Sequence, residues 1–136
     1  MSSSSFTFDG IEFNFELNVP KCFVLKKEFG INLLNLFEDE NLSAFATTMA
    51  LNDEKMLDLL WWIVSKKLTD QEAFYEKVTR DTLTKFKECV WQGIINFSDP
   101  AAKPILKEFK QRLPELLEQN ALSMFRQEAQ QQSENS

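Results

Sequence analysis

The chain has 136 residues, of which 43% are apolar, and this is enough for one domain with a sizeable core and argues against wholesale disorder. It contains no histidine, which excludes Ser-His-Asp and Cys-His nucleophile systems and the usual histidine-ligated metal sites. Its three glycines lie far apart, so no glycine loop can cradle a phosphate, and a net charge of −6 disfavours nucleic-acid binding.

A β-hairpin is predicted near the N-terminus. Residues 6–17, FTFDGIEFNFEL, alternate between apolar and polar side chains with one interruption at Asp9-Gly10. Asp-Gly favours a two-residue type I′ turn, which would place Phe6 opposite Phe13. All the large apolar side chains then share one face: Phe6, Phe8, Ile11, Phe13, Phe15 and Leu17.

Such a hairpin is marginal alone in water, so its apolar face needs a cover. We expect the hairpin either to cover one side of a helical core or to pair through its edge with another copy of the chain.

The remaining residues predict helices. Pro20 suits the start of the first helix and Gly30 its end, with Phe23, Val24 and Phe29 available for packing. Further helical stretches are expected at 31–39, at 42–51, at 53–67, from a capping box at 69–72 with a bend near 79–82, and from Pro104 with a break or kink at Pro114.

The clearest amphipathic pattern lies in the second half of the chain. Large apolar residues recur there at spacings of three and four, at Leu83, Phe86, Val90, Ile94 and Phe97. This stripe indicates a helix that faces the core.

The expected fold is therefore mainly α, with the N-terminal hairpin packed on a bundle of five to seven helices. We expect a single domain over residues 6–126. The serine-rich residues 1–5 and the polar residues 127–136 are predicted to be disordered tails.

Trp62 is the strongest candidate for contact with a partner. It belongs to the sequence LLWWIV, but on a helical wheel it falls among charged and polar residues. Trp62 either packs beneath a loop or the hairpin, or it is an exposed anchor of the kind enriched in interface hot spots.

Two further residues flank the apolar stripe. Trp91 and Ile95 either widen the core or insert into a groove of a partner. We take four residues as candidate protein-binding residues: Trp61, Trp62, Trp91 and Ile95.

No catalytic, cofactor-binding or metal-ligating residue is assigned. The acidic clusters Glu38-Asp39-Glu40 and Asp53-Glu54 fall at predicted helix ends, where acids are ordinary. Cys22 and Cys89 are far apart and are expected to be small core residues.

The segment 103–112, KPILKEFKQR, is basic. It predicts a solvated face, or a surface that docks an acidic partner or an acidic patch on another copy. The chain has neither a signal-peptide pattern nor an apolar run of the roughly 20 residues that span a membrane. We expect a soluble, cytoplasmic protein with no membrane contact.

The order of these features resembles the tail assembly chaperones of long-tailed bacteriophages. The resemblance covers residues 6–126: the hairpin FTFDGIEFNFEL, the stretch KKEFGINLLNL with its single glycine, the helix LDLLWWIVSKKLTDQEAF and the amphipathic helices that follow. It implies a protein without catalytic activity or cofactor that works in the cytoplasm of the bacterial host cell.

The partner that the resemblance implies is the tape measure protein, a long helical protein that the chaperone binds and solubilises while the tail tube assembles around it. The tail tube protein is a further expected partner, and self-association is expected as well. The physical properties agree, because apolar helix faces suit a helical partner and the net charge of −6 favours solubility.

Two other functions remain open. The chain could be a small acidic inhibitor or regulatory module that binds a host protein, or a small enzyme of unfamiliar type. Salt separates the inhibitor from the chaperone. An acidic inhibitor releases a basic partner as the salt concentration rises, whereas the apolar contacts of a chaperone persist.

Overall fold

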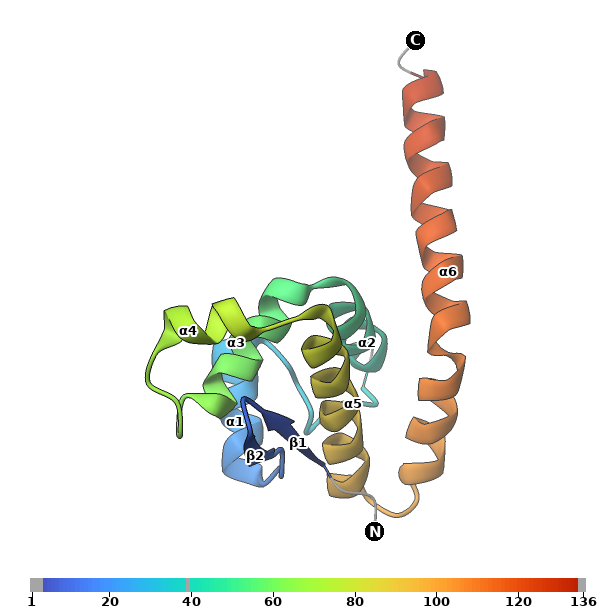
Figure 1. The fold of residues 1–136 in the computed structure, drawn as a ribbon. Coiled ribbons are helices and arrows are strands. Elements are labelled where there is room, and N and C mark those ends of the chain that lie inside the picture. Colours follow the sequence, from blue (N-terminus) through green and yellow to red (C-terminus); the bar gives the residue numbers. More distant parts are fainter. Residues whose placement is uncertain (1–3, 39, 135–136) are drawn as a thin grey trace. The chain divides into compact units, whose positions relative to one another are not determined.

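The computed structural model describes residues 4–38 and 40–134, with side chains described as far as residue 119 (Figure 1). The chain forms two compact units, residues 1–99 and 100–136, where the sequence predicted one domain over 6–126. The described residues are mainly helical and follow the order β1 (Ser5–Phe8), β2 (Ile11–Asn14), α1 (Val19–Phe29), α2 (Asn41–Leu51), α3 (Asp53–Val64), α4 (Gln71–Lys77), α5 (Arg80–Phe97) and α6 (Lys103–Glu134). The predicted fold class, a hairpin with five to seven helices, is confirmed.

The hairpin has the predicted turn and register. Asp9 and Gly10 both have positive φ, at 53° and 75°, as a type I′ turn requires. Strands β1 and β2 are antiparallel, with Phe6 opposite Phe13. Four of the six residues on the predicted apolar face are buried: Phe6, Phe8, Phe13 and Phe15.

Part of each predicted tail belongs to the described structure. Ser5 begins β1, and Ser4 is buried with its carbonyl accepting a hydrogen bond from the N–H of Phe15 at 2.8 Å. The hairpin ladder therefore includes these two serines, while residues 1–3 lie outside the described part. At the other end, α6 continues to Glu134, so residues 127–134 are helical.

Helix α1 begins and ends as its sequence predicts, but it buries a different face. Gly30 has a φ of 68°, and its N–H returns to carbonyls of the last turn. The buried side chains are Cys22 and Leu25, whereas Phe23 and Val24 are 58% and 37% exposed. Phe23 and Val24, which the sequence marked as available for packing, therefore lie outside the core.

The helix predicted at 31–39 is absent over the described residues 31–38. Turns occupy that stretch, because asparagine side chains offer the backbone alternative hydrogen bonds. The Asn32 side chain accepts from the N–H of Asn35 at 3.3 Å, and the Asn41 side chain donates to the carbonyl of Asn35 at 2.8 Å. The stretch still contributes Ile31, Leu33 and Leu36 to the core.

Capping residues set most other boundaries. Asn52 caps α3 as predicted, but the helix ends at Val64, three residues before the predicted end. Asp70 rather than Thr69 caps α4, since its carboxylate accepts from the N–H of Ala73 at 3.2 Å. The predicted bend near 79–82 is a break in which Thr79 caps the new helix α5.

The core of the first unit lies between the hairpin and the helices α2 to α5. Phe6 packs on Phe86 of α5 with ring centroids 5.4 Å apart, and Phe8 packs on Phe74 of α4 at 5.5 Å. Of the predicted stripe on α5, four residues are buried and Phe97 is 36% exposed. The hairpin thus covers a helical core, which was the first of the two expectations for its apolar face.

In the second unit, α6 runs through Pro114 as one continuous helix, so of the two expected outcomes, a break or a kink, the break is absent. A proline in a helix interior removes one main-chain hydrogen bond and costs about 3 kcal/mol. On α6, Ile105 is 55% exposed and Leu106 is buried.

Candidate partner-binding surface

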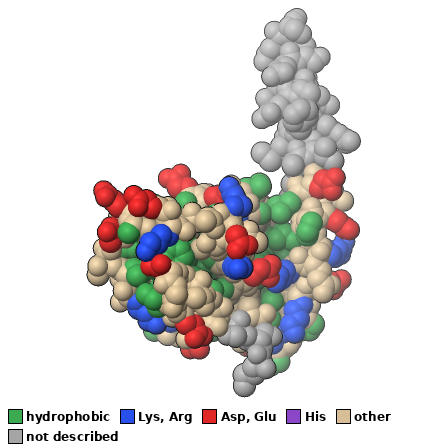
Figure 2. Space-filling view, viewed as in Figure 1, with side chains coloured by type: hydrophobic (Ala, Val, Ile, Leu, Met, Phe, Trp, Pro, Cys, Tyr) green, Lys and Arg blue, Asp and Glu red, His purple; other side chains and the backbone are tan. Residues whose placement is uncertain are grey.

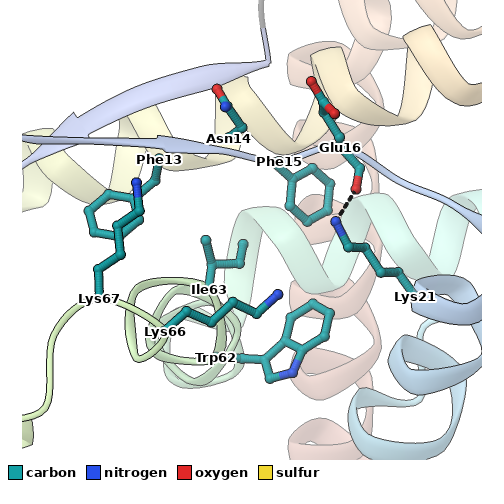
Figure 3. A pocket seen from close by; sticks show the side chains of 9 residues that line it. All are labelled: Phe13, Asn14, Phe15, Glu16, Lys21, Trp62, Ile63, Lys66 and Lys67. Atoms are coloured by element: carbon teal, nitrogen blue, oxygen red, sulfur yellow. Dashed lines mark hydrogen bonds between the residues drawn. The ribbon is translucent and has the colours of Figure 1, made fainter.

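A groove lies between β2, α1 and the C-terminal end of α3 (Figure 3). Its volume is about 210 Å³. Figure 3 shows the rings of Phe13, Phe15 and Trp62 around this space, with Ile63 between them. The apolar walls therefore come from β2 with the segment directly after it, and from α3, which is distant from them in the sequence, while α1 contributes Lys21.

Lysines surround the opening. Lys21 belongs to α1, and Lys66 and Lys67 follow α3, while Glu16 is the one acidic residue among those lining the groove. The ammonium of Lys66 lies 5.5 Å from the ring centroid of Trp62, and that of Lys67 lies 5.3 Å from the ring centroid of Phe13. These cation–π contacts hold the charges at the rim of an apolar site.

Two of the lysines also bond to the hairpin backbone. Lys67 Nζ donates to the carbonyl of Glu12 at 2.9 Å, and Lys21 Nζ donates to the carbonyl of Glu16 at 2.8 Å. Along an antiparallel ladder, residue pairs that share backbone hydrogen bonds alternate with pairs that do not. The N–H of Phe15 bonds to the carbonyl of Ser4, and Glu12 lies three positions before Phe15, so the N–H and C=O of Glu12 point away from β1. Lys67 therefore occupies a carbonyl on the outer edge of β2 and Lys21 occupies one just beyond its end, which hinders the addition of another strand there.

Trp62 packs against α1, whereas the sequence left open packing beneath a loop or the hairpin, or an exposed anchor. It is partly buried, and its ring lies 5.7 Å from that of Phe29 on α1. It also lines the open groove. Trp61 is partly buried too, but it packs on Phe74 of α4 at 5.2 Å, away from the residues that line the groove.

Trp91 and Ile95 do not provide an exposed surface. They are 4% and 3% exposed, and Trp91 makes an edge contact with Phe45 of α2 at 5.3 Å. Core packing, the first of the two alternatives for these residues, is what the structure shows. The four predicted residues are therefore not brought together into one site.

Several other large apolar side chains are exposed in the first unit. Val19 and Phe23 lie one turn apart on α1 and are 50% and 58% exposed. Figure 2 shows apolar side chains at the surface among carboxylates and basic groups. Among the described residues of this unit, the other exposed large apolar side chains are Val24, Leu34, Phe37, Leu51, Tyr75 and Phe97.

Asp53 has a structural role. It accepts bonds from Arg80 and from Lys87, the latter at 2.9 Å, and so joins α3 to α5. Hydrogen bonds from these two cations lower the pKa of the Asp53 carboxyl below its ordinary value of 3.8. Of the other predicted acidic cluster, Glu38 and Glu40 are exposed and Asp39 lies outside the described residues.

The two cysteines are buried free thiols, as predicted. Burial raises the pKa of Cys22, and it raises the pKa of Cys89 to about 11. Within the described residues, no group of three or more acidic or cysteine side chains is arranged to hold a metal ion. No helix in that same part of the chain is both long and apolar enough to cross a membrane.

The sequence missed most of the groove. The pair Lys66-Lys67, which follows LLWWIV after Ser65, was a usable signal, because Lys66 lies one helical turn from Trp62 in the sequence. Nothing in the local sequence connects Lys21 with this helix, since only the packing of α1 brings the two together.

Comparison with protein-family models, with curated proteins and with solved structures found no match to this chain.

Proposed function

We propose that this protein is a non-catalytic chaperone of phage tail assembly, which binds the tape measure protein through apolar surfaces and keeps it soluble. The proposal places it in the cytoplasm of the bacterial host cell. The observation that carries it is the exposed apolar surface of the first unit, above all Val19 and Phe23 on α1 and the groove at Trp62. The resemblance in the order of the sequence features supports it.

This surface suits a helical client. Val19 and Phe23 are spaced by four residues, so they form one face of α1 that can pack beside an apolar stripe on another helix. A long helical protein with apolar stripes offers many such contacts before assembly. Each contact can be modest in affinity, which permits release when the tail tube forms.

The test is an affinity pull-down of the tagged chain from cells that produce its native gene set, washed at high salt and analysed by mass spectrometry. Recovery of a very long, helix-rich protein, with or without a tail tube subunit, is expected. Recovery that is lost at high salt, with a single basic host protein as the partner, would instead favour an acidic inhibitor, which the net charge of −6 would suit.

Two substitutions separate binding from folding. Trp62→Ala should reduce recovery of the long partner with only a small loss of stability, because Trp62 is partly exposed. Ile94→Ala should cost roughly 2–5 kcal/mol of unfolding free energy, since Ile94 is 2% exposed in the core. Thermal unfolding followed by circular dichroism measures the stability of both variants. Full recovery of the partner in a pull-down with the Trp62→Ala variant would contradict the role of Trp62.

A further inference from the structure

The groove at Trp62 differs in charge from the chain as a whole. Three lysines and one glutamate line it, in a protein whose net charge is −6. Each lysine ammonium has three N–H donors. Lys21 and Lys67 each use one of them in a hydrogen bond to a backbone carbonyl, of Glu16 and Glu12 respectively. The remaining donors can bind carboxylates that approach the rim.

The size of the groove fits one large apolar side chain. Its volume of about 210 Å³ exceeds the cavity of about 150 Å³ that accommodates benzene in a protein interior. Its walls are Phe13, Phe15 and Trp62, so an aromatic or long aliphatic side chain would find apolar contacts on several sides.

The backbone of the occupant is constrained as well. An extended strand is hindered because Lys67 and Lys21 already bond to the carbonyls of Glu12 and Glu16. A helix needs none of these carbonyls, and it presents residues three or four positions apart on the same face, so a helical occupant suits the groove better than a strand.

We propose that this groove binds a helical segment of a partner protein in which one large apolar side chain is flanked by carboxylates. The apolar side chain enters between Trp62 and Phe15, and the carboxylates bind Lys21 and Lys66 at the rim. This inference rests on the proposed function, and it specifies which segments of a long helical client the protein selects.

A second copy of the chain is the competing occupant. It offers Phe37, which is 51% exposed, beside the exposed Glu38. Self-docking would, however, bring together two chains that each carry a net charge of −6, which repel one another over their whole surfaces. A local acidic segment of another protein avoids most of that repulsion.

The test uses the full chain and three fluorescein-labelled helical peptides that differ only at the key positions. The first carries one Phe with Glu residues one turn before and after it. The second has Lys in place of both Glu residues, and the third has Ala in place of Phe. Fluorescence anisotropy at low salt should show the first peptide binding roughly tenfold more tightly than either control peptide.

Charge-reversal variants locate the site. Lys66→Glu should weaken the first peptide roughly fivefold, the scale expected for exposed ion pairs. Lys27→Glu is the matched control, because it makes the same charge change at an exposed position of α1 that does not line the groove. Equal binding of all three peptides, or equal loss in both variants, would overturn the proposal.

Sedimentation velocity tests whether a second copy of the chain, rather than a partner protein, occupies the groove. An oligomer that both Lys66→Glu and Phe37→Ala dissociate, without binding of the acidic peptide, would overturn the partner-protein proposal in favour of self-docking.

The pull-down separates this inference from the proposed function. If a pull-down with the Lys66→Glu variant recovers as much of the long helical partner as one with the natural chain, the chaperone function stands and the groove inference fails. If the acidic peptide binds but no long partner is recovered, the groove inference stands and the chaperone function fails.

Discussion

Single residues in this protein take their roles from neighbours that are distant in the sequence. Gly93 lies inside the predicted stripe of α5, where its sequence gives no reason for a glycine. A Cβ atom there would lie 2.5 Å from the Phe15 ring and 2.7 Å from the Phe15 carbonyl oxygen. Gly93 therefore allows the hairpin to approach α5 closely, and Phe15 also forms one wall of the groove.

Gly93→Ala should lower the unfolding free energy by about 1–3 kcal/mol, because the added methyl group overpacks the contact with Phe15. Urea denaturation measures the loss, with Asn96→Ala at an exposed position of the same helix as the control. A stabilised Gly93→Ala variant, as helix propensity alone would give, would show that the hairpin can shift away without cost.

At the scale of elements, side-chain hydrogen bonds decided where helices start and stop. The stretch 31–38 has apolar residues at spacings that suit a helix, yet Asn32, Asn35 and Asn41 hold it in turns. Helix α3 shows the opposite case, since Asn52 caps it where the sequence predicts. The first acid of α3, Asp53, then does more than complement the helix dipole, because it ties α3 to α5 through Arg80 and Lys87.

The pair of cations at Asp53 predicts a dependence of stability on acid pH. Because the folded-state pKa of Asp53 is lowered, its contribution is present above its ordinary pKa of 3.8 and is lost as the pH falls towards the folded-state value. The contribution should be under about 1 kcal/mol, since these side chains are partly exposed.

Urea denaturation across the acid range tests this. Asp53→Asn should be less stable than the natural chain above the ordinary pKa of the carboxyl, and the difference should shrink as the pH falls below that value. Lys87→Gln should reproduce part of the effect. A difference that stays constant with pH would show that the ion pairs contribute nothing in solution.

At the scale of the whole molecule, the chain divides into two compact units, residues 1–99 and 100–136. The first unit contains a set of aromatic contacts, which includes Phe6 with Phe13, Phe6 with Phe86 and Phe45 with Trp91. The groove lies entirely in this unit as well, and so do Val19 and Phe23.

A chain that ends at Asp99 should therefore keep the hairpin, α1 to α5 and the groove. We expect a cooperative urea transition and binding of the acidic Phe peptide within about threefold of the full chain. The full chain measured alongside is the control. Loss of cooperative unfolding in the shortened chain would show that residues 100–136 are needed for the fold.

The sequence by itself determined the features that depend on local chemistry. Asp9-Gly10 specified the turn and register of the hairpin, Gly30 and Asn52 specified helix ends, and the spacing from Leu83 to Ile94 specified a buried helix face. These follow from backbone preferences and hydrophobic periodicity, which act over a few residues.

Only the tertiary structure decided which apolar residues are hidden and which surface remains open. It buried Trp91 and Ile95, exposed Phe23, and placed Lys21 beside Trp62. Burial depends on what lies on the other side of an element, and that neighbour comes from another part of the chain. For the same reason, the groove could be anticipated from Lys66-Lys67 only in part, because its floor and its third lysine come from β2 and α1.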